Sequence, residues 1–140
     1  GLPNIRTELQ DASVCREEWK DSADVVLCDV PCSGLGIIRK KPEIRFKNPD
    51  EIRTLPEIQA KILANCAQYV KKGGTLVYST CTILQRENED VVRAFLTENP
   101  EFEAVSWTHP VCGERADGMV TLLPPVHNTD GFFIAKMHRK

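Results

Sequence analysis

The sequence has few of the features that mark membrane, secreted or broadly basic proteins. No apolar run approaches the roughly 18 residues of a membrane span, and the opening Gly1-Leu2-Pro3-Asn4 is not a signal peptide. The 18 basic and 20 acidic residues nearly balance, so the chain carries no broad electrostatic signature of nucleic-acid binding and leaves room only for a local basic patch. The 140 residues suffice for one soluble globular domain that buries roughly two-thirds of its unfolded surface.

Metal-binding and disulfide patterns are also missing, although the chain has six cysteines. No C-x-x-C pair occurs, and His109 and Cys112 lack the matching second ligand pair of a zinc site. An even cysteine count favours a disulfide framework only in small, secreted, loop-rich chains. Here Cys28 ends an apolar run and Cys66 lies in a helical pattern, so both are predicted to be small buried hydrophobes. We infer a reducing, cytoplasmic setting and no bound metal.

Hydropathy patterns predict strands and helices that alternate along most of the chain. The predicted strands cover residues 5–9, 24–29, 75–79, 102–107, 120–123 and 131–137. A short helical segment should begin at Asn48. The main helix is predicted to begin at a capping box at Thr54 and to end at Lys71 or Lys72. A second helix should cover residues 87–97, and residues 109–119 should form an irregular loop.

Alternating strands and helices favour a parallel sheet with helices on its faces. The last two strands are joined by a loop without a crossover helix, so one strand should be antiparallel. The runs Val25-Val26-Leu27 and Leu76-Val77-Tyr78 are typical of buried parallel strands. Asp29 and Cys32 follow the first run, and Cys81 follows the second. Two thiols and a carboxylate should therefore lie along one rim, where open α/β sheets gather their chemistry.

A cysteine at this rim has two interpretations. A thiol is a nucleophile only as the thiolate, and the small polar neighbours of Cys81 favour the anion. Pro31 fixes the backbone beside Cys32, and two nearby glycines let that backbone approach a ligand closely. The alternative is structural: half-buried cysteines at strand ends, a turn whose small residues only pack, and an Asp29 that caps the turn.

Four segments of the sequence together resemble one enzyme family. Residues 29–36, Asp-Val-Pro-Cys-Ser-Gly-Leu-Gly, are similar to the D-[AV]-P-C-S-G-x-G motif of the Sun family of RNA cytosine-C5 methyltransferases. Residues 78–89 resemble that family's Y-S-T-C-[ST]-x-x-x-x-E-N-E motif, residues 130–136 its D-G-F-F-x-A-[KR] ending, and residues 39–44 its R-[RK]-x-P-[DE]-[IV] segment. The motifs occur in the family's order and cover nearly the whole chain. Within the family, the bacterial enzymes of small-subunit ribosomal RNA are the most similar.

The resemblance implies covalent methylation of cytosine C5 with S-adenosylmethionine as cofactor. In this family the cysteine of the second motif, here Cys81, adds to C6 of the ring and makes C5 nucleophilic. The cysteine of the first motif, here Cys32, is assigned to freeing the product. Asp29 is expected near N3 of the ring as a general acid, and it borders the methyl-donor pocket together with Pro31. Asp11 matches an acidic residue that contacts the adenine of the cofactor.

A basic cluster follows the first motif. Its members are Arg39, Lys40, Lys41, Arg45 and Lys47. In an enzyme of this family they are expected to hold phosphates of ribosomal RNA on either side of a cytosine that has left its stack. The alternative is a solvated loop, and the sequence favours neither.

Two features of the family's catalytic domain are missing from the sequence: the glycine-rich cofactor loop and the acidic residue that ends the following strand. Residues 1–140 are therefore predicted to be the C-terminal portion of that domain, an α/β fold with a partial Rossmann-like class I methyltransferase sheet. We expect strands equivalent to 4-5-7-6, mostly parallel with one antiparallel strand, and a displaced or mobile strand 3 at residues 5–9. Alone, the chain should bind S-adenosylmethionine weakly or not at all and should not methylate RNA. The exposed edge of strand 24–29 invites self-association.

Two other interpretations come from different functional classes. A non-catalytic remnant that binds RNA or a partner would keep the fold without the reaction. The missing glycine-rich loop favours such a remnant, and the retention of both cysteines opposes it. A cysteine-dependent hydrolase would need a histidine as base, whereas His109, His127 and His138 all lie outside the two cysteine motifs.

Overall fold

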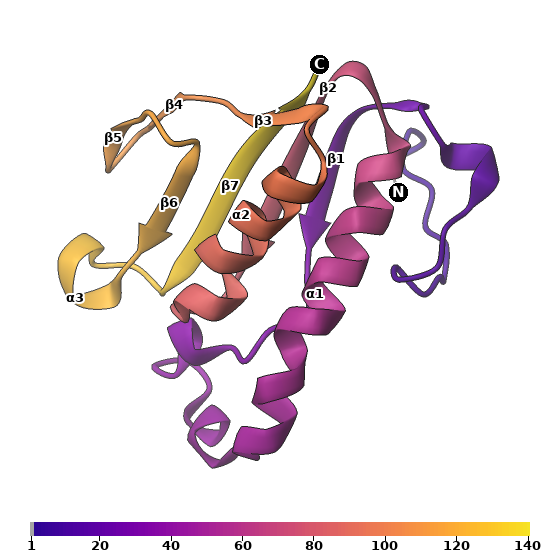
Figure 1. Ribbon diagram of the computed structural model, residues 1–140. Helices are drawn as coiled ribbons and strands as arrows, with labels where there is room; N and C mark the ends of the chain where they lie inside the picture. The colour runs from indigo at the N-terminus through magenta and orange to yellow at the C-terminus, as the bar shows by residue number, and fades with distance from the viewer. Residues whose placement is uncertain (1) are drawn as a thin grey trace.

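A single five-stranded sheet organises the computed structural model, which describes residues 2–140 (Figure 1). Its order is β1-β2-β7-β3, with β6 also paired to β7. The strands are β1 (Ala23–Asp29), β2 (Val70–Thr80), β3 (Phe102–Ala104), β6 (Met119–Leu122) and β7 (Phe132–Arg139). β1 and β2 are parallel, whereas β7 is antiparallel to β2, β3 and β6. This confirms the predicted order equivalent to 4-5-7-6, in which one strand runs against the others.

The outer position beside β7 is shared by two short strands. β3 pairs with the carboxyl end of β7 and β6 with its amino end. Between them the chain leaves the sheet and forms a hairpin of β4 (Trp107–His109) and β5 (Gly113–Arg115). The predicted strand over 102–107 therefore ends early, and the predicted loop over 109–119 contains a strand. The left-handed φ of 73° at Gly113 and the Nδ1 of His109, which accepts the amide protons of Val111 and Cys112, support this turn.

The hydrophobic core lies between the sheet and two helices, α1 (Pro49–Tyr69) and α2 (Glu89–Glu98), which pack on the same face (Figure 1). Side chains alternate along a strand, so every second residue of β1, β2 and β7 faces these helices. Six of those residues are almost completely buried: Cys28, Leu76, Tyr78, Phe133, Ala135 and Met137. Leu63 of α1 and Val92 and Phe95 of α2 fill the space opposite them.

The other face of β1 is open. Val25 and Leu27 point away from α1 and are 63% and 69% exposed. The sequence predicts a buried strand with helices on the faces of the sheet, and for β1 this expectation is wrong. Among residues 2–140, β1 is an edge strand that pairs only with β2, and both long helices lie on the opposite face, so no described element covers its outer side. Hydropathy alone does not distinguish a strand covered on both faces from one covered on a single face.

Helix α1 is longer at its start and shorter at its end than the sequence indicates. The side chain of Asn48 accepts the amide proton of Asp50 at 3.0 Å and caps the helix there. Thr54 does not cap; its hydroxyl donates to the carbonyl of Glu51 within the helix. The helix ends at Tyr69 because the fully buried Val70 turns into the sheet with extended backbone. Lys71 and Lys72 consequently belong to β2.

The remaining helical elements are short. The 3₁₀ helices are η1 (Glu17–Trp19), η2 (Leu35–Ile37), η3 (Pro42–Phe46) and η4 (Gln85–Glu87). The short α-helix α3 covers Pro124–His127. Helix α2 starts two residues later than predicted because η4 precedes it. None of the helices within residues 2–140 combines the length and the hydropathy that crossing a bilayer requires.

The predicted strand over residues 5–9 does not form. This segment has irregular backbone, Ile5 is largely exposed and Leu9 is fully exposed. A strand needs a hydrogen-bonded neighbour, and β1 does not pair with this segment. Polar contacts with α1 hold the chain that follows: the Asn65 amide donates to the carbonyls of Ala12 and Val14 at 2.7 and 3.1 Å.

Candidate active site

The two motif cysteines meet at the carboxyl ends of β1 and β2. The sulfur atoms of Cys32 and Cys81 are 3.2 Å apart, although the residues are separated by 49 positions in sequence. The parallel ladder explains this approach. Asp29 is in register with Ser79, and the amide of Val30 donates to the Ser79 carbonyl, so the chain leaves both strands at the same level.

Cys32 and Cys81 both line a cavity of about 440 Å³. This volume lies within the range of roughly 300–1,000 Å³ that is typical of small-molecule sites. Its polar wall consists of Asp29, Cys32, Cys81, Lys41, Glu43 and Lys47, and its apolar wall includes Pro31, Ile37, Ile44 and Phe132. Two carboxylates, two thiols and two ammonium groups therefore converge on one concave surface, as the sequence predicts for the thiols and Asp29.

The carboxylate of Asp29 is oriented by the strand beside it. The hydroxyl of Ser79, its register partner, donates to Oδ1 at 3.0 Å. Ser79 is itself buried, so this hydroxyl has few alternative partners. The cross-strand bond fixes the direction in which the carboxylate enters the cavity.

Backbone hydrogen bonds of Gly36 join three of the four sequence motifs. Its amide donates to the carbonyl of Cys81 at 3.0 Å, and its carbonyl accepts from the amide of Gly131 at 2.8 Å. A Cβ atom at position 36 would lie 2.1 Å from the Gly131 carbonyl oxygen, closer than real contacts allow. The motifs at 29–36, 78–89 and 130–136 thus depend on a backbone approach that only glycine permits.

The two thiols differ in their acid–base properties. Burial, together with the hydrogen bond to Cys81, raises the pKa of the Cys32 thiol to about 12. Near pH 7 the Cys32 thiol therefore stays protonated. Because only a thiolate is a good nucleophile, Cys32 is the poorer candidate for attack and Cys81 the better one.

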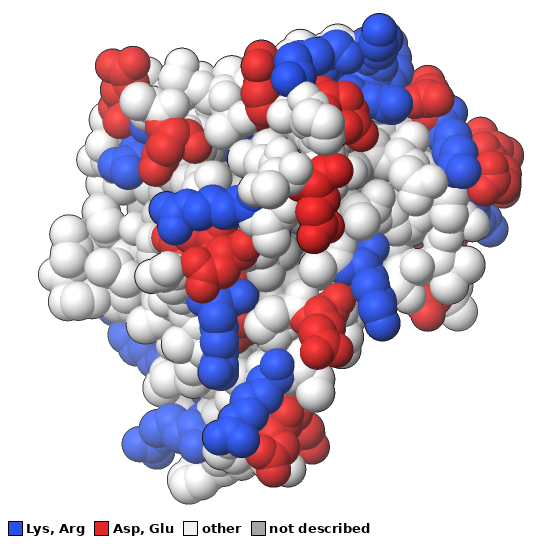
Figure 2. Space-filling model, viewed as in Figure 1, with Lys and Arg blue, Asp and Glu red and all other residues white. Residues whose placement is uncertain are grey.

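The predicted basic cluster separates into three groups. Lys41 and Lys47 line the cavity, and the Lys47 ammonium also donates to the Ser33 carbonyl at 2.9 Å. Arg39 and Lys40 form ion pairs with Asp130. The Arg45 guanidinium lies over the exposed ring of Phe46, 5.6 Å from its centre. Figure 2 shows acidic and basic side chains interspersed on the face that carries α1 and α2, without a continuous field of one sign.

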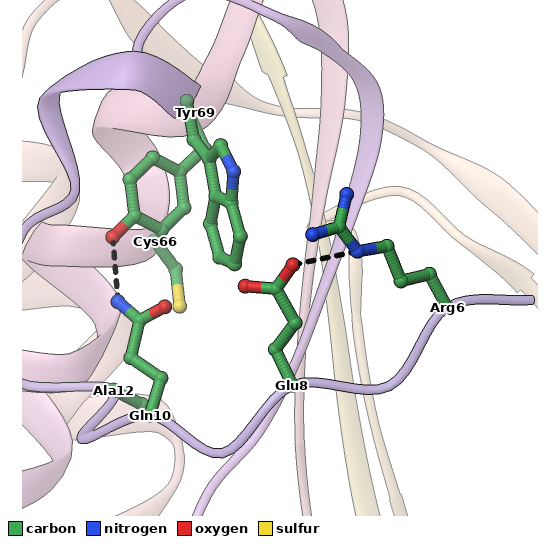
Figure 3. Close-up of a pocket in the computed structure, with 7 residues that line it drawn as sticks. Arg6, Glu8, Gln10, Ala12, Cys66 and Tyr69 are labelled. Carbon is green, nitrogen blue, oxygen red and sulfur yellow. Dashed lines mark hydrogen bonds and ion pairs between the residues drawn. The ribbon is translucent and has the colours of Figure 1, made fainter.

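Asp11 does not lie at the thiol cavity. Its carboxylate is exposed and accepts hydrogen bonds from the hydroxyl and the amide of Ser13, which lower the pKa of Asp11. Its neighbours Gln10 and Ala12 line a second cavity of about 410 Å³, together with residues from the carboxyl end of α1 (Figure 3). In this cavity the Gln10 amide approaches the Tyr69 hydroxyl at 3.5 Å. The described residues therefore do not bring the predicted adenine contact together with the predicted catalytic groups.

Comparison with known proteins identifies the family. The family model for the 16S rRNA methyltransferase RsmB/F matches residues 1–138. The chain belongs to this RsmB/F family. It is 44% identical to the probable ribosomal RNA small subunit methyltransferase B of Bacillus subtilis, over its whole length and 33% of that protein. It is 40% identical to the ribosomal RNA small subunit methyltransferase B of Thermus thermophilus, over 85% of this chain and 30% of that protein. It thus spans about a third of the curated relatives it matches.

Solved structures of related proteins have the same fold. The crystal structure of PH0851 superposes with a TM-score of 0.85 at 37% identity and covers 93% of this chain and 30% of that protein. A methyltransferase homologue from Pyrococcus horikoshii has a TM-score of 0.66 at 30% identity, over 84% of this chain and 39% of that protein. NSun6 from the same organism, solved with SFG, has a TM-score of 0.77 at 23% identity, over 99% of this chain and 35% of that protein. At that identity the last match supports the fold alone.

Sequence reasoning assigned no role to the buried polar residues of this RsmB/F-family site. Gln59, Ser33, Thr82, Glu87 and Asn88 are completely buried behind the two thiols. The second motif ends in Glu-Asn-Glu and so contained Glu87 and Asn88. A polar stretch retained in a motif was a signal for these two residues, but charged residues are seldom buried without partners, so their burial was not predicted. The part of the chain that the structure describes contains no cluster of three His, Cys, Asp or Glu side chains able to hold a metal ion, and its six cysteines are free thiols.

Proposed function

We propose that this chain is the C-terminal portion of an S-adenosylmethionine-dependent methyltransferase that methylates C5 of a cytosine in ribosomal RNA. Membership of the RsmB/F family and the names of its relatives support methyl transfer to ribosomal RNA. The observation that carries the finer proposal is the 3.2 Å separation of the Cys32 and Cys81 sulfur atoms within one cavity that Asp29 also lines. Two adjacent thiols without a histidine base suit reversible addition to a pyrimidine ring better than hydrolysis.

The proposed reaction uses Cys81 as nucleophile. Its thiolate adds to C6 of the cytosine, and the electron pair of the 5,6 double bond makes C5 nucleophilic. C5 then takes the methyl group while the carbon–sulfur bond of the donor breaks. A solvent water takes the C5 proton, the C–H electron pair re-forms the 5,6 double bond, and the Cys81 sulfur leaves as thiolate. One covalent intermediate thus replaces direct attack by a weak carbon nucleophile.

Cys32 and Asp29 have supporting roles in this proposal. The high pKa of Cys32 keeps its thiol protonated, which suits a group that assists release of the Cys81 sulfur and argues against Cys32 as the attacking thiolate. Asp29, held by Ser79 at the cavity wall, keeps the proton on N3 of the ring while C6 is attacked. Lys41 and Lys47 at the cavity border are placed to contact phosphates beside a flipped-out cytosine.

The described residues fit only part of the cofactor. S-adenosylmethionine supplies a methyl group on a positively charged sulfur, and the Asp29 carboxylate in the cavity wall, beside Pro31, suits that charge. Asp11, proposed for the adenine, lies on an exposed loop outside the cavity, and the sequence has no glycine-rich loop to hold the rest. We therefore expect the isolated chain to bind the cofactor weakly or not at all. Titration calorimetry checks this, and micromolar binding would contradict it.

A trapping experiment tests the covalent step. Residues 1–140 replace the matching segment of the Bacillus subtilis relative, and the chimera is incubated with S-adenosylmethionine and RNA that contains 5-fluorocytosine. Fluorine at C5 cannot leave as a proton, so the reaction should stop as a protein–RNA adduct that survives denaturing electrophoresis. Cys81→Ser should abolish the adduct, and Cys32→Ser should retain it. An adduct that persists in Cys81→Ser would refute the assignment. A chimera that binds RNA but never forms the adduct would favour the non-catalytic remnant.

A further inference from the structure

A buried polar cluster lies behind the two thiols and has no part in the proposed reaction. Glu87, Asn88 and Gln59 are each 0% exposed. Glu87 is an acidic residue in the interior, and among residues 2–140 no basic side chain forms an ion pair with it. A buried carboxyl group is costly unless hydrogen bonds compensate it. The bonds that Glu87 makes are therefore informative.

Glu87 and Gln59 hold the backbone on both sides of Cys32. The Ser33 amide donates to the Glu87 Oε2 at 2.8 Å. The Gln59 side-chain amide donates to the same oxygen and to the Pro31 carbonyl, both at 3.0 Å. The Pro31 carbonyl and the Ser33 amide belong to the two peptide groups that flank the Cα of Cys32. Fixing both peptide planes fixes the direction of the Cα–Cβ bond that carries the Cys32 sulfur.

Asn88 holds the residues on both sides of Cys81, one through its side chain and one through its backbone. Its side-chain oxygen accepts from the Thr80 hydroxyl at 2.6 Å, and its side-chain amide donates to the Thr82 carbonyl at 3.0 Å. These two partners are the residues on either side of Cys81. The hydroxyls of Ser33 and Thr82 are 2.7 Å apart and join the two turns directly.

Glu87 binds the turn that carries Cys32, and the next residue, Asn88, binds the turn that carries Cys81. Their own backbone is anchored to the core, because the buried Tyr78 hydroxyl donates to the Glu87 carbonyl at 2.6 Å. We propose that Glu87 and Asn88, together with Gln59, form a bracket of positioning residues that sets the separation and relative direction of the Cys32 and Cys81 sulfur atoms. No member of the bracket lines the cavity, so it acts only through the turns. Its importance for catalysis depends on the proposed function, whereas its effect on thiol geometry does not.

Thiol–disulfide exchange in the isolated chain tests the bracket without any methyl transfer. Glutathione disulfide oxidises the Cys32 and Cys81 thiols to one protein disulfide and is reduced to two glutathione thiols. The equilibrium constant measures how well the fold places the two sulfur atoms together. Mass spectrometry quantifies the link between tryptic peptides 21–39 and 73–86, and fragment ions separate Cys32 from Cys28 in the first peptide.

Glu87→Ala removes the acceptor shared by the Ser33 amide and Gln59, so it should lower the equilibrium constant about tenfold, the effect expected for unpaired buried donors. Glu87→Gln retains a side-chain oxygen for both donors and should stay within about threefold of the native value. If Glu87→Ala fails to fold, the equilibrium constant of Gln59→Leu tests the proposal instead. This substitution removes the bonds to the Pro31 carbonyl and to the Glu87 Oε2 but keeps the bond between Glu87 and the Ser33 amide. An equilibrium constant equal to that of the native chain would overturn the proposal.

Asn65→Ala is the matched control. Asn65 is also buried on α1, but its amide binds the loop at Ala12 and Val14, away from the thiols. This variant should lose stability and keep the native equilibrium constant at a temperature where circular dichroism shows every protein folded. An equal decrease in Asn65→Ala and Glu87→Ala would mean general loosening and would refute the bracket. If Glu87→Ala alone decreases while the Cys81→Ser chimera still forms the RNA adduct, the proposed function fails and the bracket stands.

Discussion

The thiol site buries polar side chains, whereas the amino-terminal segment exposes apolar ones. Around the thiols, polar residues such as Thr82, Glu87 and Asn88 are completely buried. In residues 2–16, apolar residues such as Ile5 and Leu9 are exposed. The difference lies in the partners available. The buried polar groups find hydrogen bonds on two neighbouring turns, whereas the apolar segment has no strand beside it. Burial in this chain thus follows the availability of partners more closely than hydropathy.

The largest effect is expected at the half-buried Cys32 thiol. The pKa of Cys32 is raised from 9.0 to about 12, so at pH 8 its thiolate should be about a thousandfold rarer than in the unfolded chain. Initial rates of alkylation by iodoacetamide, measured by peptide mass spectrometry in buffer and in urea, check this. Because the pKa is raised, the rate in the folded chain should still increase about tenfold per pH unit above pH 9, where the thiolate of the unfolded chain is already approaching its full population. Equal alkylation rates in buffer and urea would mean that Cys32 is as accessible as a thiol in the exposed segments and would contradict the raised pKa.

Two leucines on neighbouring strands test the covered and open faces of the sheet. Leu76 on β2 is completely buried, and Leu27 on β1 is 69% exposed. Leu76→Ala should reduce the free energy of unfolding by about 2–5 kcal/mol because it leaves a cavity. Leu27→Ala should cost less than about 0.5 kcal/mol, as for other surface positions. Urea denaturation of both variants gives the values. Similar losses would indicate that the open face is covered in solution.

The crossing of the motifs at Gly36 should tolerate little change. Gly36→Ala places a Cβ against the Gly131 carbonyl and should cost about 3 kcal/mol, since backbone on both sides has to move. Gly73→Ala is the control: it has a left-handed φ of 78° but nothing within 4 Å of the new Cβ. It should cost only about 1 kcal/mol, from the backbone conformation alone. Thermal denaturation compares the two, and an equal loss would show that the close approach at Gly36 is not what fixes the site.

The smallest effect is expected at the open edge. β1 exposes one ladder edge and the apolar side chains of Val25 and Leu27, so the chain should self-associate weakly as its concentration increases. Leu27→Lys should suppress this without loss of fold, and sedimentation velocity at several concentrations measures it. Amides of residues 25–28 should exchange rapidly at low concentration. Strong protection of these amides in a monomer would contradict an open edge.

Sequence patterns located most of the sheet because its main strands are long and apolar. β1 and the antiparallel β7 were predicted within about two residues at each end, and β2 was predicted except for its first five residues and its last one. The hairpin of β4 and β5 was missed because strands of three residues are too short to show periodicity. The strand predicted over residues 5–9 is wrong because a favourable pattern does not supply the neighbour that a strand requires. The start of α1 was misplaced because Thr54 has the form of a cap but lies within a helix that Asn48 already caps.

What the sequence determined by itself is the order of the elements and the position of Asp29, Cys32 and Cys81 directly after two strands. Only the tertiary structure decided that the two sulfur atoms lie 3.2 Å apart, that Cys32 stays protonated, and that Glu87 is buried. Local patterns report the preferences of adjacent residues, whereas distances across 49 positions depend on the register of the ladder and on the hydrogen bonds that join the turns. Proton affinity and burial depend in turn on which groups those contacts bring together.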